Sequence, residues 1–214
     1  MGNSFLKLRY KRKIGFLLIA LMAFAVLSGC SERSGSKFKT NFDTVQPSTA
    51  VAMRGNKINL YSGSFQKGTI LENSSLSNGE LKIFPLKPNG KVRLLSIVPS
   101  LDTPVCDAQT HLLWETKMLH KDVERITISR DLPMAQKRFA QKTGFDQIAF
   151  LSDYKTGGFG KETGLMMEGL ELLSRSIIVL DKEGKIHYYQ IVPEISNLPD
   201  MEKAFSVAND LVEK

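Results

Sequence analysis

The sequence predicts a three-layer α/β domain, built around a sheet that is covered on both faces. Short apolar segments alternate with helical stretches from about residue 51 onward, and no repeat of fixed period is present. Two segments, 92–98 and 177–180, are too apolar for a half-exposed sheet. Hydrophobic residues make up 42% and charged residues 24% of the 214 positions, with 16 Gly and 8 Pro. This composition suits one globular domain and excludes collagen-like, low-complexity and disulfide-scaffold proteins.

The first 29 residues have the layout of a secretory signal. Five basic residues precede an apolar run at 14–27, which ends in small residues. The run is too short to cross a bilayer comfortably, since a transmembrane helix needs about 17–25 residues. Leu27-Ser28-Gly29-Cys30 resembles the lipobox of bacterial lipoproteins, in which the cysteine sulfur carries a diacylglycerol and becomes the new N-terminus. An uncleaved N-terminal anchor and an ordinary secreted protein are the alternatives.

The lipobox interpretation divides the chain into three parts. Residues 1–29 are a lipoprotein signal peptide, and residues 30–50 are the lipidated N-terminus and a flexible tether. Residues 51–214 are the folded domain. Cys30 would carry acyl chains such as palmitate and take no part in redox chemistry, and two or three chains would hold the protein stably at a bacterial membrane. The expected location is extracytoplasmic, on the periplasmic face or the cell surface.

The charge balance argues against a nucleic-acid partner. The formal net charge is +7, from 29 basic and 22 acidic residues, but the first 29 residues hold five basic and no acidic side chains. The rest of the chain therefore has 24 basic and 22 acidic residues, a net charge of +2. The basic surplus belongs mostly to the leader.

β-type and helical segments follow one another from residue 51 to the C-terminus. Strands are expected at residues 57–61, 80–83, 91–98, 124–129, 147–151, 175–181 and 185–192. Asp181-Lys182-Glu183-Gly184 is typical of the tight turn of an antiparallel hairpin between the last two. Helices are expected at 106–119, 132–142 and 200–212, with Asp131 as N-cap of the second and Pro133 in its first turn. A single core of about 160 residues can be stable alone.

No cofactor or metal site is predicted. Gly157-Gly158-Phe159-Gly160-Lys161 fails as a phosphate-binding loop, because Glu162 stands where Ser or Thr must reach magnesium, and a flexible loop is expected there. The three histidines, His111, His120 and His187, share no ligand-like spacing.

Cys106 is the candidate nucleophile. It follows the most apolar strand and lies in the first turn of a helix, and ligands of open α/β sheets bind where such strand-to-helix loops converge. Unpaired backbone N–H groups and the helix dipole both favour a thiolate at this position. An ordinary thiol is only a few per cent ionised at pH 7, and a helix terminus supplies at most about 2 kcal/mol. A second donor is therefore needed, and Arg175, at the start of an apolar strand, is the best candidate, against a solvated strand-end arginine.

The residues around Cys106 resemble the peroxiredoxin signature Pro-x-x-x-Thr-x-x-Cys, with Pro99, Thr103 and Cys106 in their places. Further matches extend from about Gly55 to the C-terminus and indicate the bacterial thiol peroxidase branch. These matches are Asp131-Leu132-Pro133-Met134-Ala135-Gln136-Lys137-Arg138-Phe139, Leu173-Ser174-Arg175-Ser176 and Val192-Pro193-Glu194-Ile195. The resemblance implies a thioredoxin-like fold with a central mixed sheet and an N-terminal β-hairpin extension. It also implies an enzyme that reduces hydrogen peroxide and alkyl hydroperoxides.

The resemblance also assigns roles to individual residues. Cys106 would attack the peroxide O–O bond and become a sulfenic acid. Thr103 would hold the thiolate and the peroxide oxygen, and Pro99 would shield the sulfur from water. Arg175 would bind the thiolate and the charge that develops on the leaving oxygen. The family is often dimeric, so a homodimer is expected as well.

One departure from the family changes the predicted mechanism. The resolving cysteine of these enzymes follows Arg-Phe, where this chain has Ala140, and the sequence contains only two cysteines in all. A single-cysteine mechanism is therefore expected, with an external thiol donor such as a thioredoxin-like protein as reductant. Two alternatives remain: a non-catalytic or redox-sensing lipoprotein with the same fold, and an adhesin or assembly factor in which Cys106 is incidental.

Overall fold

The computed structural model describes residues 37–214. The signal peptide, Cys30 and the first part of the tether expected from the sequence lie outside these residues. No helix within the described range is long and apolar enough to span a membrane.

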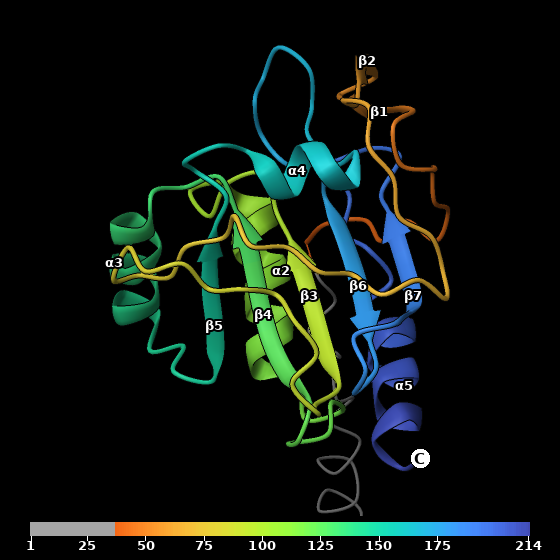
Figure 1. Ribbon diagram of the computed structural model, residues 1–214. Coiled ribbons are helices and arrows are strands. Elements are labelled where there is room, and N and C mark those ends of the chain that lie inside the picture. The colour runs from red at the N-terminus through yellow and green to blue at the C-terminus, as the bar shows by residue number, and fades with distance from the viewer. Residues whose placement is uncertain (1–36) are drawn as a thin grey trace, which may run out of the picture. The chain divides into compact units, whose positions relative to one another are not determined.

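A five-stranded mixed sheet forms the centre of the domain (Figure 1), with strand order β5-β4-β3-β6-β7. The strands are β3 (Arg93–Ile97), β4 (Glu124–Ser129), β5 (Ile148–Ser152), β6 (Ser176–Leu180) and β7 (Ile186–Ile191). β3, β4 and β5 are parallel, whereas β6 runs antiparallel to β3 and β7 antiparallel to β6. The predicted turn closes the β6–β7 hairpin, with the Gly184 amide 3.0 Å from the Asp181 carbonyl.

Helices cover one face of this sheet. They are α2 (Pro104–Glu115), α3 (Pro133–Thr143) and α5 (Met201–Val212), with α3 beside the edge strand β5 (Figure 1). A buried cluster on this face joins Leu94 and Ile177 of the sheet to Leu113 of α2 and Phe205 of α5. The mixed sheet and the helical cover confirm the predicted α/β class.

The opposite face is covered mainly by extended chain rather than by helices. The segment drawn in yellow crosses the front of the sheet in Figure 1, and the short helix α4 (Gly158–Thr163) lies beside it. Leu76, Leu86 and Phe159 from these parts are buried against Leu95 and Ile126 of the sheet. Both faces are therefore covered, which explains why apolar side chains of β3 and β6 point to both sides of the sheet.

An antiparallel hairpin precedes the main sheet, as the resemblance implied. It consists of β1 (Ala50–Met53) and β2 (Asn56–Asn59), with Met53 paired to Asn56 across a two-residue turn. Arg54 and Gly55 in this turn have φ values of 53° and 79°. Positive φ at both central positions is the geometry of a type I′ turn, which matches the twist of the flanking strands.

The predicted start of the folded part, at residue 51, is too late. The Lys39 carbonyl and the Asn41 amide both bond to the backbone of Leu198, at 2.7 and 2.8 Å. The Val45 amide donates to the Ile191 carbonyl at 3.1 Å. These residues are bound to the domain through backbone hydrogen bonds, which hydrophobic patterning does not detect.

Two further local predictions are wrong. The strand expected at residues 80–83 is a turn, because Asn78 Oδ1 accepts the amides of Glu80 and Lys82, both at 3.1 Å. The loop expected at residues 157–161 contains the start of α4. This helix begins there because the buried Asp153 carboxylate accepts the amides of Phe159 and Gly160, at 3.1 and 2.9 Å.

Candidate active site

The sheet topology brings Cys106 and Arg175 to the same edge. β3 leads into the loop before α2, and its last residue, Ile97, pairs with Ser176, the first residue of β6. Because these strands are antiparallel, the residue before β6 lies beside the residues that follow β3. Arg175 is therefore next to the Cys106 loop although 69 positions separate the two residues in sequence.

Cys106 occupies the third position of α2 and is completely buried. Thr103 is the N-cap residue, but its hydroxyl does not cap the helix. Thr103 Oγ1 instead lies 2.9 Å from Cys106 Sγ. The backbone N–H groups of the first turn have no partners within the helix, so positive potential surrounds the sulfur.

Arg175 is 2% exposed, and each nitrogen of its guanidinium has a partner. Nη2 donates to Cys106 Sγ at 3.3 Å, Nη1 to Gln109 Oε1 at 2.7 Å and Nε to the Ile195 carbonyl at 2.7 Å. These three bonds fix the guanidinium plane and direct one edge at the sulfur. The structure thus brings together Thr103, Cys106 and Arg175, as the sequence analysis expected.

Gln109 was not singled out by the sequence analysis. It lies one turn after Cys106 on α2, is fully buried, and donates from Nε2 to Ser96 Oγ at 2.8 Å. This second bond orients its amide, so that Oε1 faces Arg175. Gln109 could have been predicted from its spacing, because residues three positions apart lie on the same face of a helix.

The charge of Arg175 has no acidic partner in the described part of the chain, because none of the ion pairs there includes Arg175. A buried cation without an anion carries a large desolvation cost. Of the three groups that accept its hydrogen bonds, only the Cys106 sulfur can become an anion. Arg175 therefore directs its positive charge at the one partner that can carry a negative charge.

Asp131 does not cap α3 as predicted; Leu132 is the N-cap residue and makes no side-chain cap. The Asp131 carboxylate instead accepts from Ser100 Oγ at 2.7 Å, the Leu101 amide at 2.8 Å and Ser129 Oγ at 2.7 Å. It thereby ties the loop before α2 to the end of β4. The cause is the parallel pairing of β3 and β4, which places both loops at one edge.

Pro99 is buried and lines a cavity of about 240 Å³ beside the sulfur site. Thr103 and Arg175 line the same cavity. Most of the remaining lining is apolar and comes from distant parts of the chain: Met53, Pro104, Val105, Met167, Leu170, Leu172 and Ile195. A small molecule can therefore approach the two side chains that hold the sulfur.

Ala140, at the position where the resemblance expects a resolving cysteine, lies in α3 and lines a separate cavity. Within residues 37–214, Cys106 is present as a free thiol. An intramolecular disulfide partner is therefore missing from the part of the chain that the structure describes.

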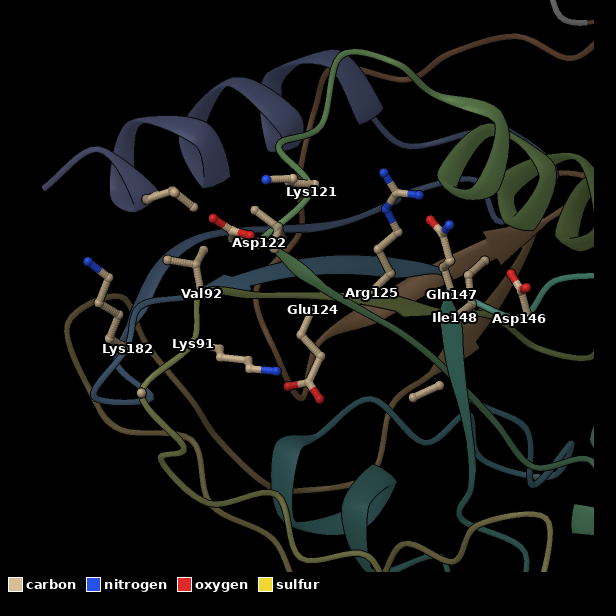
Figure 2. A pocket seen from close by; sticks show the side chains of 14 residues that line it. Lys91, Val92, Lys121, Asp122, Glu124, Arg125, Asp146, Gln147, Ile148 and Lys182 are labelled. Atoms are coloured by element: carbon tan, nitrogen blue, oxygen red, sulfur yellow. The ribbon is translucent and has the colours of Figure 1, made fainter.

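A larger cavity, of about 680 Å³, lies at the opposite end of the sheet (Figure 2). Side chains of both charges line it, and those of Lys91 and Glu124 point toward one another. It holds no cysteine or histidine. Residues 37–214 also contain no group of three side chains suited to a metal ion. Of these two cavities, the one beside Cys106 has a nucleophilic side chain next to it.

Fold and site together define an α/β thiol protein whose cysteine starts a helix beside a buried arginine. The Redoxin family model matches residues 65–205. The thiol peroxidase of Halalkalibacterium halodurans is 38% identical over 160 residues, covering 74% of this chain and 96% of that protein. The Bacillus subtilis thiol peroxidase is 44% identical over 123 residues, covering 58% of this chain and 74% of that protein.

The solved structures agree with the sequence relatives. A peroxiredoxin-like protein from Aquifex aeolicus superposes with a TM-score of 0.71 at 28% identity, covering 78% of this chain and 99% of that one. A thiol peroxidase from Chromobacterium violaceum has a TM-score of 0.67 at 18% identity and shares the fold. The chain belongs to the redoxin family and, within it, to the bacterial thiol peroxidases. It is an oxidoreductase of the peroxidase type.

Proposed function

We propose that this protein reduces hydrogen peroxide and alkyl hydroperoxides through Cys106 alone and is regenerated by an external thiol. The observation that carries the proposal is the pair of donors on one buried sulfur, Thr103 Oγ1 at 2.9 Å and Arg175 Nη2 at 3.3 Å. Hydrogen bonds to a charged group are worth about 1.5–3 kcal/mol each, so the two together favour a thiolate.

The oxidation step follows from this geometry. The Cys106 thiolate attacks one peroxide oxygen, an S–O bond forms and the O–O bond breaks. The leaving oxygen departs as hydroxide or alkoxide and takes up a proton, giving water or an alcohol, and Cys106 becomes a sulfenic acid. Arg175 faces the cavity as well as the sulfur, so it stabilises the charge that develops on the leaving oxygen.

The reduction step needs a thiol from outside, because Ala140 replaces the resolving cysteine. One external thiol attacks the sulfenic sulfur, releases water and forms a mixed disulfide. A second thiol then attacks that disulfide and restores the Cys106 thiolate. A dithiol protein of the thioredoxin type supplies both thiols, and two electrons pass to each peroxide.

A turnover assay tests this proposal. Purified protein is mixed with hydrogen peroxide or an alkyl hydroperoxide and an excess of dithiol reductant, and peroxide and thiol are followed together. The wild-type protein is expected to consume one dithiol per peroxide, and Cys106→Ser to have no activity above the uncatalysed rate. Cys30→Ser is the matched control, expected to turn over like the wild type, since Cys106 alone reacts.

Two outcomes contradict the proposal. Equal peroxide consumption by wild type and Cys106→Ser would place the activity elsewhere. Stoichiometric oxidation of Cys106 with no turnover by any dithiol would favour a redox-sensing protein of the same fold. Intact mass after peroxide addition separates these cases, because it reports the oxygen atom gained by Cys106.

We further infer that the protein is lipid-anchored through Cys30 on the extracytoplasmic side of a bacterial membrane. The support is the order of basic residues, apolar run and Leu27-Ser28-Gly29-Cys30 in the sequence. Metabolic labelling with a fatty acid should mark the wild-type protein and leave Cys30→Ser unlabelled. Label in Cys30→Ser, or an intact mass that retains residues 1–29, would contradict the anchor.

A further inference from the structure

A four-residue turn between α4 and β6 forms part of the wall of the cavity beside the sulfur. The turn, residues 168–171, protrudes at the top of Figure 1. Two backbone bonds close it: the Met167 amide donates to the Leu172 carbonyl at 2.9 Å, and the Glu171 amide to the Met167 carbonyl at 3.0 Å. Leu170, within the turn, and Leu172 line the cavity, and Leu170 is 40% exposed. The position of the turn therefore decides how complete this apolar wall is.

The base of this turn is held by backbone pairing with the end of β2 and the residues that follow it. The Glu168 amide donates to the Asn59 carbonyl at 2.9 Å, and the Tyr61 amide donates to the Met166 carbonyl at 2.8 Å. These two bonds fix the chain up to residue 168. Neither of them reaches residues 169–171, so the far end of the turn depends on a different contact.

The side chain of Glu171 makes that contact. Its Oε1 accepts a hydrogen bond from the Tyr61 hydroxyl at 2.6 Å. The Tyr61 ring is itself held in place, because it packs against the buried core and Lys161 Nζ of α4 lies 5.8 Å from its centroid. The hydrogen bond to Glu171 is the main cause that raises the pKa of Tyr61 above its ordinary value of 10.0, and the charge of Glu168 adds to it. The hydroxyl therefore remains a donor at neutral pH.

Glu171 also has an unfavourable backbone conformation. Its φ is 54°, in the left-handed region that residues with a long side chain rarely adopt. Gly169 in the same turn has a φ of 77°, which costs a glycine little. A strained residue persists only where the surrounding contacts hold it. For Glu171, the hydroxyl of Tyr61 is such a contact.

We propose that Tyr61 and Glu171 form a latch that holds the wall made by Leu170 and Leu172, so that Tyr61 is a positioning residue for the reaction at Cys106. This inference rests on the proposed function, since the cavity leads to the same sulfur. With the latch closed, the wall confines the organic group of a hydroperoxide. Without the latch, the strain at Glu171 releases the turn and the wall is lost. Hydrogen peroxide has no organic group and does not depend on the wall.

The test measures single-turnover oxidation of Cys106 by cumene hydroperoxide and by hydrogen peroxide, and the ratio of the two rate constants is the readout. Tyr61→Phe removes only the hydroxyl. A hydrogen bond to a charged acceptor typically shifts an equilibrium about tenfold or more, so the ratio in Tyr61→Phe should fall about two- to fivefold. The protection factor of the Glu171 amide should fall in the same variant. Tyr61→Phe combined with Glu171→Asn should recover most of the ratio, because Asn adopts a positive φ more readily than Glu.

Tyr189→Phe is the matched control, because Tyr189 packs against the same core, donates from its hydroxyl to Gln46 Oε1 at 2.8 Å and does not line the cavity. It should keep the wild-type ratio. An unchanged ratio in Tyr61→Phe, an equal fall in Tyr189→Phe, or an equal loss of rate with both peroxides would overturn the latch while leaving the peroxidase function intact. A double variant that recovers nothing would overturn the role of strain at Glu171. No oxidation of wild-type Cys106 by either peroxide would instead remove the proposed function itself.

Discussion

The Thr103 hydroxyl has one hydrogen and two acceptors within reach. Its oxygen lies 2.9 Å from Cys106 Sγ and 3.2 Å from the Ser100 carbonyl. A thiolate is the stronger acceptor of the two, so the hydrogen turns to the sulfur in the reactive form. This geometry explains why a Thr precedes the cysteine by three positions.

Replacing Thr103 by Val removes the hydroxyl and keeps the branched shape. We expect Thr103→Val to slow the oxidation of Cys106 by hydrogen peroxide about tenfold or more, because a hydrogen bond to a charged group is worth about 1.5–3 kcal/mol. Thr103→Ser should recover most of the rate. Stopped-flow measurement of thiol loss checks both, and a Val variant as fast as the wild type would remove Thr103 from the site.

Residues with one distinctive chemical role could be predicted from the sequence. Cys106 and Thr103 were predictable from their spacing at the start of a helix. Arg175 was predictable because it is a charged residue directly before an apolar strand. Gln109 and Asp131 could not be assigned in this way. Each is a common polar residue whose partners, Arg175 for the one and Ser100 for the other, are distant in sequence.

Among the elements, the β1–β2 hairpin pairs through Ala52 with the backbone of Pro193 and Ile195, and the Glu194 carboxylate accepts the amides of its turn residues, Arg54 and Gly55. Burial alone would raise the pKa of Glu194, but the hydrogen bonds from Ser196, Gly55 and Arg54 together lower it below its ordinary value of 4.5. A group with a lowered folded pKa contributes stability that is present above the unfolded value and is lost as the pH falls through the folded one. The hairpin turn should therefore loosen in acid.

We predict that Glu194→Gln weakens this attachment at neutral pH, because an amide has only one acceptor oxygen for the turn amides. Amide hydrogen exchange at Arg54 and Gly55 should be faster in Glu194→Gln than in the wild type. Acidification through the lowered pKa of Glu194 should reduce the protection factors of these amides, which correct for intrinsic exchange, more in the wild type than in the variant. Equal protection in the two proteins at neutral pH would show that the strand pairing alone holds the hairpin.

The elements that could be predicted are those with apolar periodicity. The central strands and the three long helices fall close to their expected bounds. The segment 80–83 and helix α4 were misjudged because side-chain acceptors decide their backbone: Asn78 makes the turn, and Asp153 starts the helix. Such local bonds compete with propensity and leave little trace in a hydrophobic pattern.

At the scale of the whole molecule, the antiparallel pairing of β6 with β3 assembles the site from remote parts of the chain. Arg175 of the site directly precedes β6, and β6 pairs with β7. Tyr188 lies on β7 and is half-buried beside the hydrophobic cluster that includes Phe205 of α5. Burial, and secondarily the charge of Asp200, raises the pKa of Tyr188 from 10.0 to about 12.

This shift predicts alkaline instability. Since the folded state keeps the Tyr188 proton longer than the unfolded state, the stability it contributes is fully present below pH 10 and is lost as the pH rises through about 12. The unfolding free energy from urea titration should fall less across this window in Tyr188→Phe than in the wild type. The difference will be modest, because solvent screens a half-exposed group. Parallel curves for the two proteins would contradict the raised pKa.

If Arg175 makes the Cys106 sulfur reactive, removing its guanidinium must slow the single-turnover oxidation of Cys106 by peroxide. Stopped-flow mixing of reduced protein with hydrogen peroxide gives this rate without any reductant. Removing one donor that stabilises developing charge typically costs about 10²–10³-fold, so Arg175→Gln should react slower by that factor. Circular dichroism establishes that the variant is folded. A folded Arg175→Gln protein that reacts as fast as the wild type would show that Arg175 does not activate the sulfur.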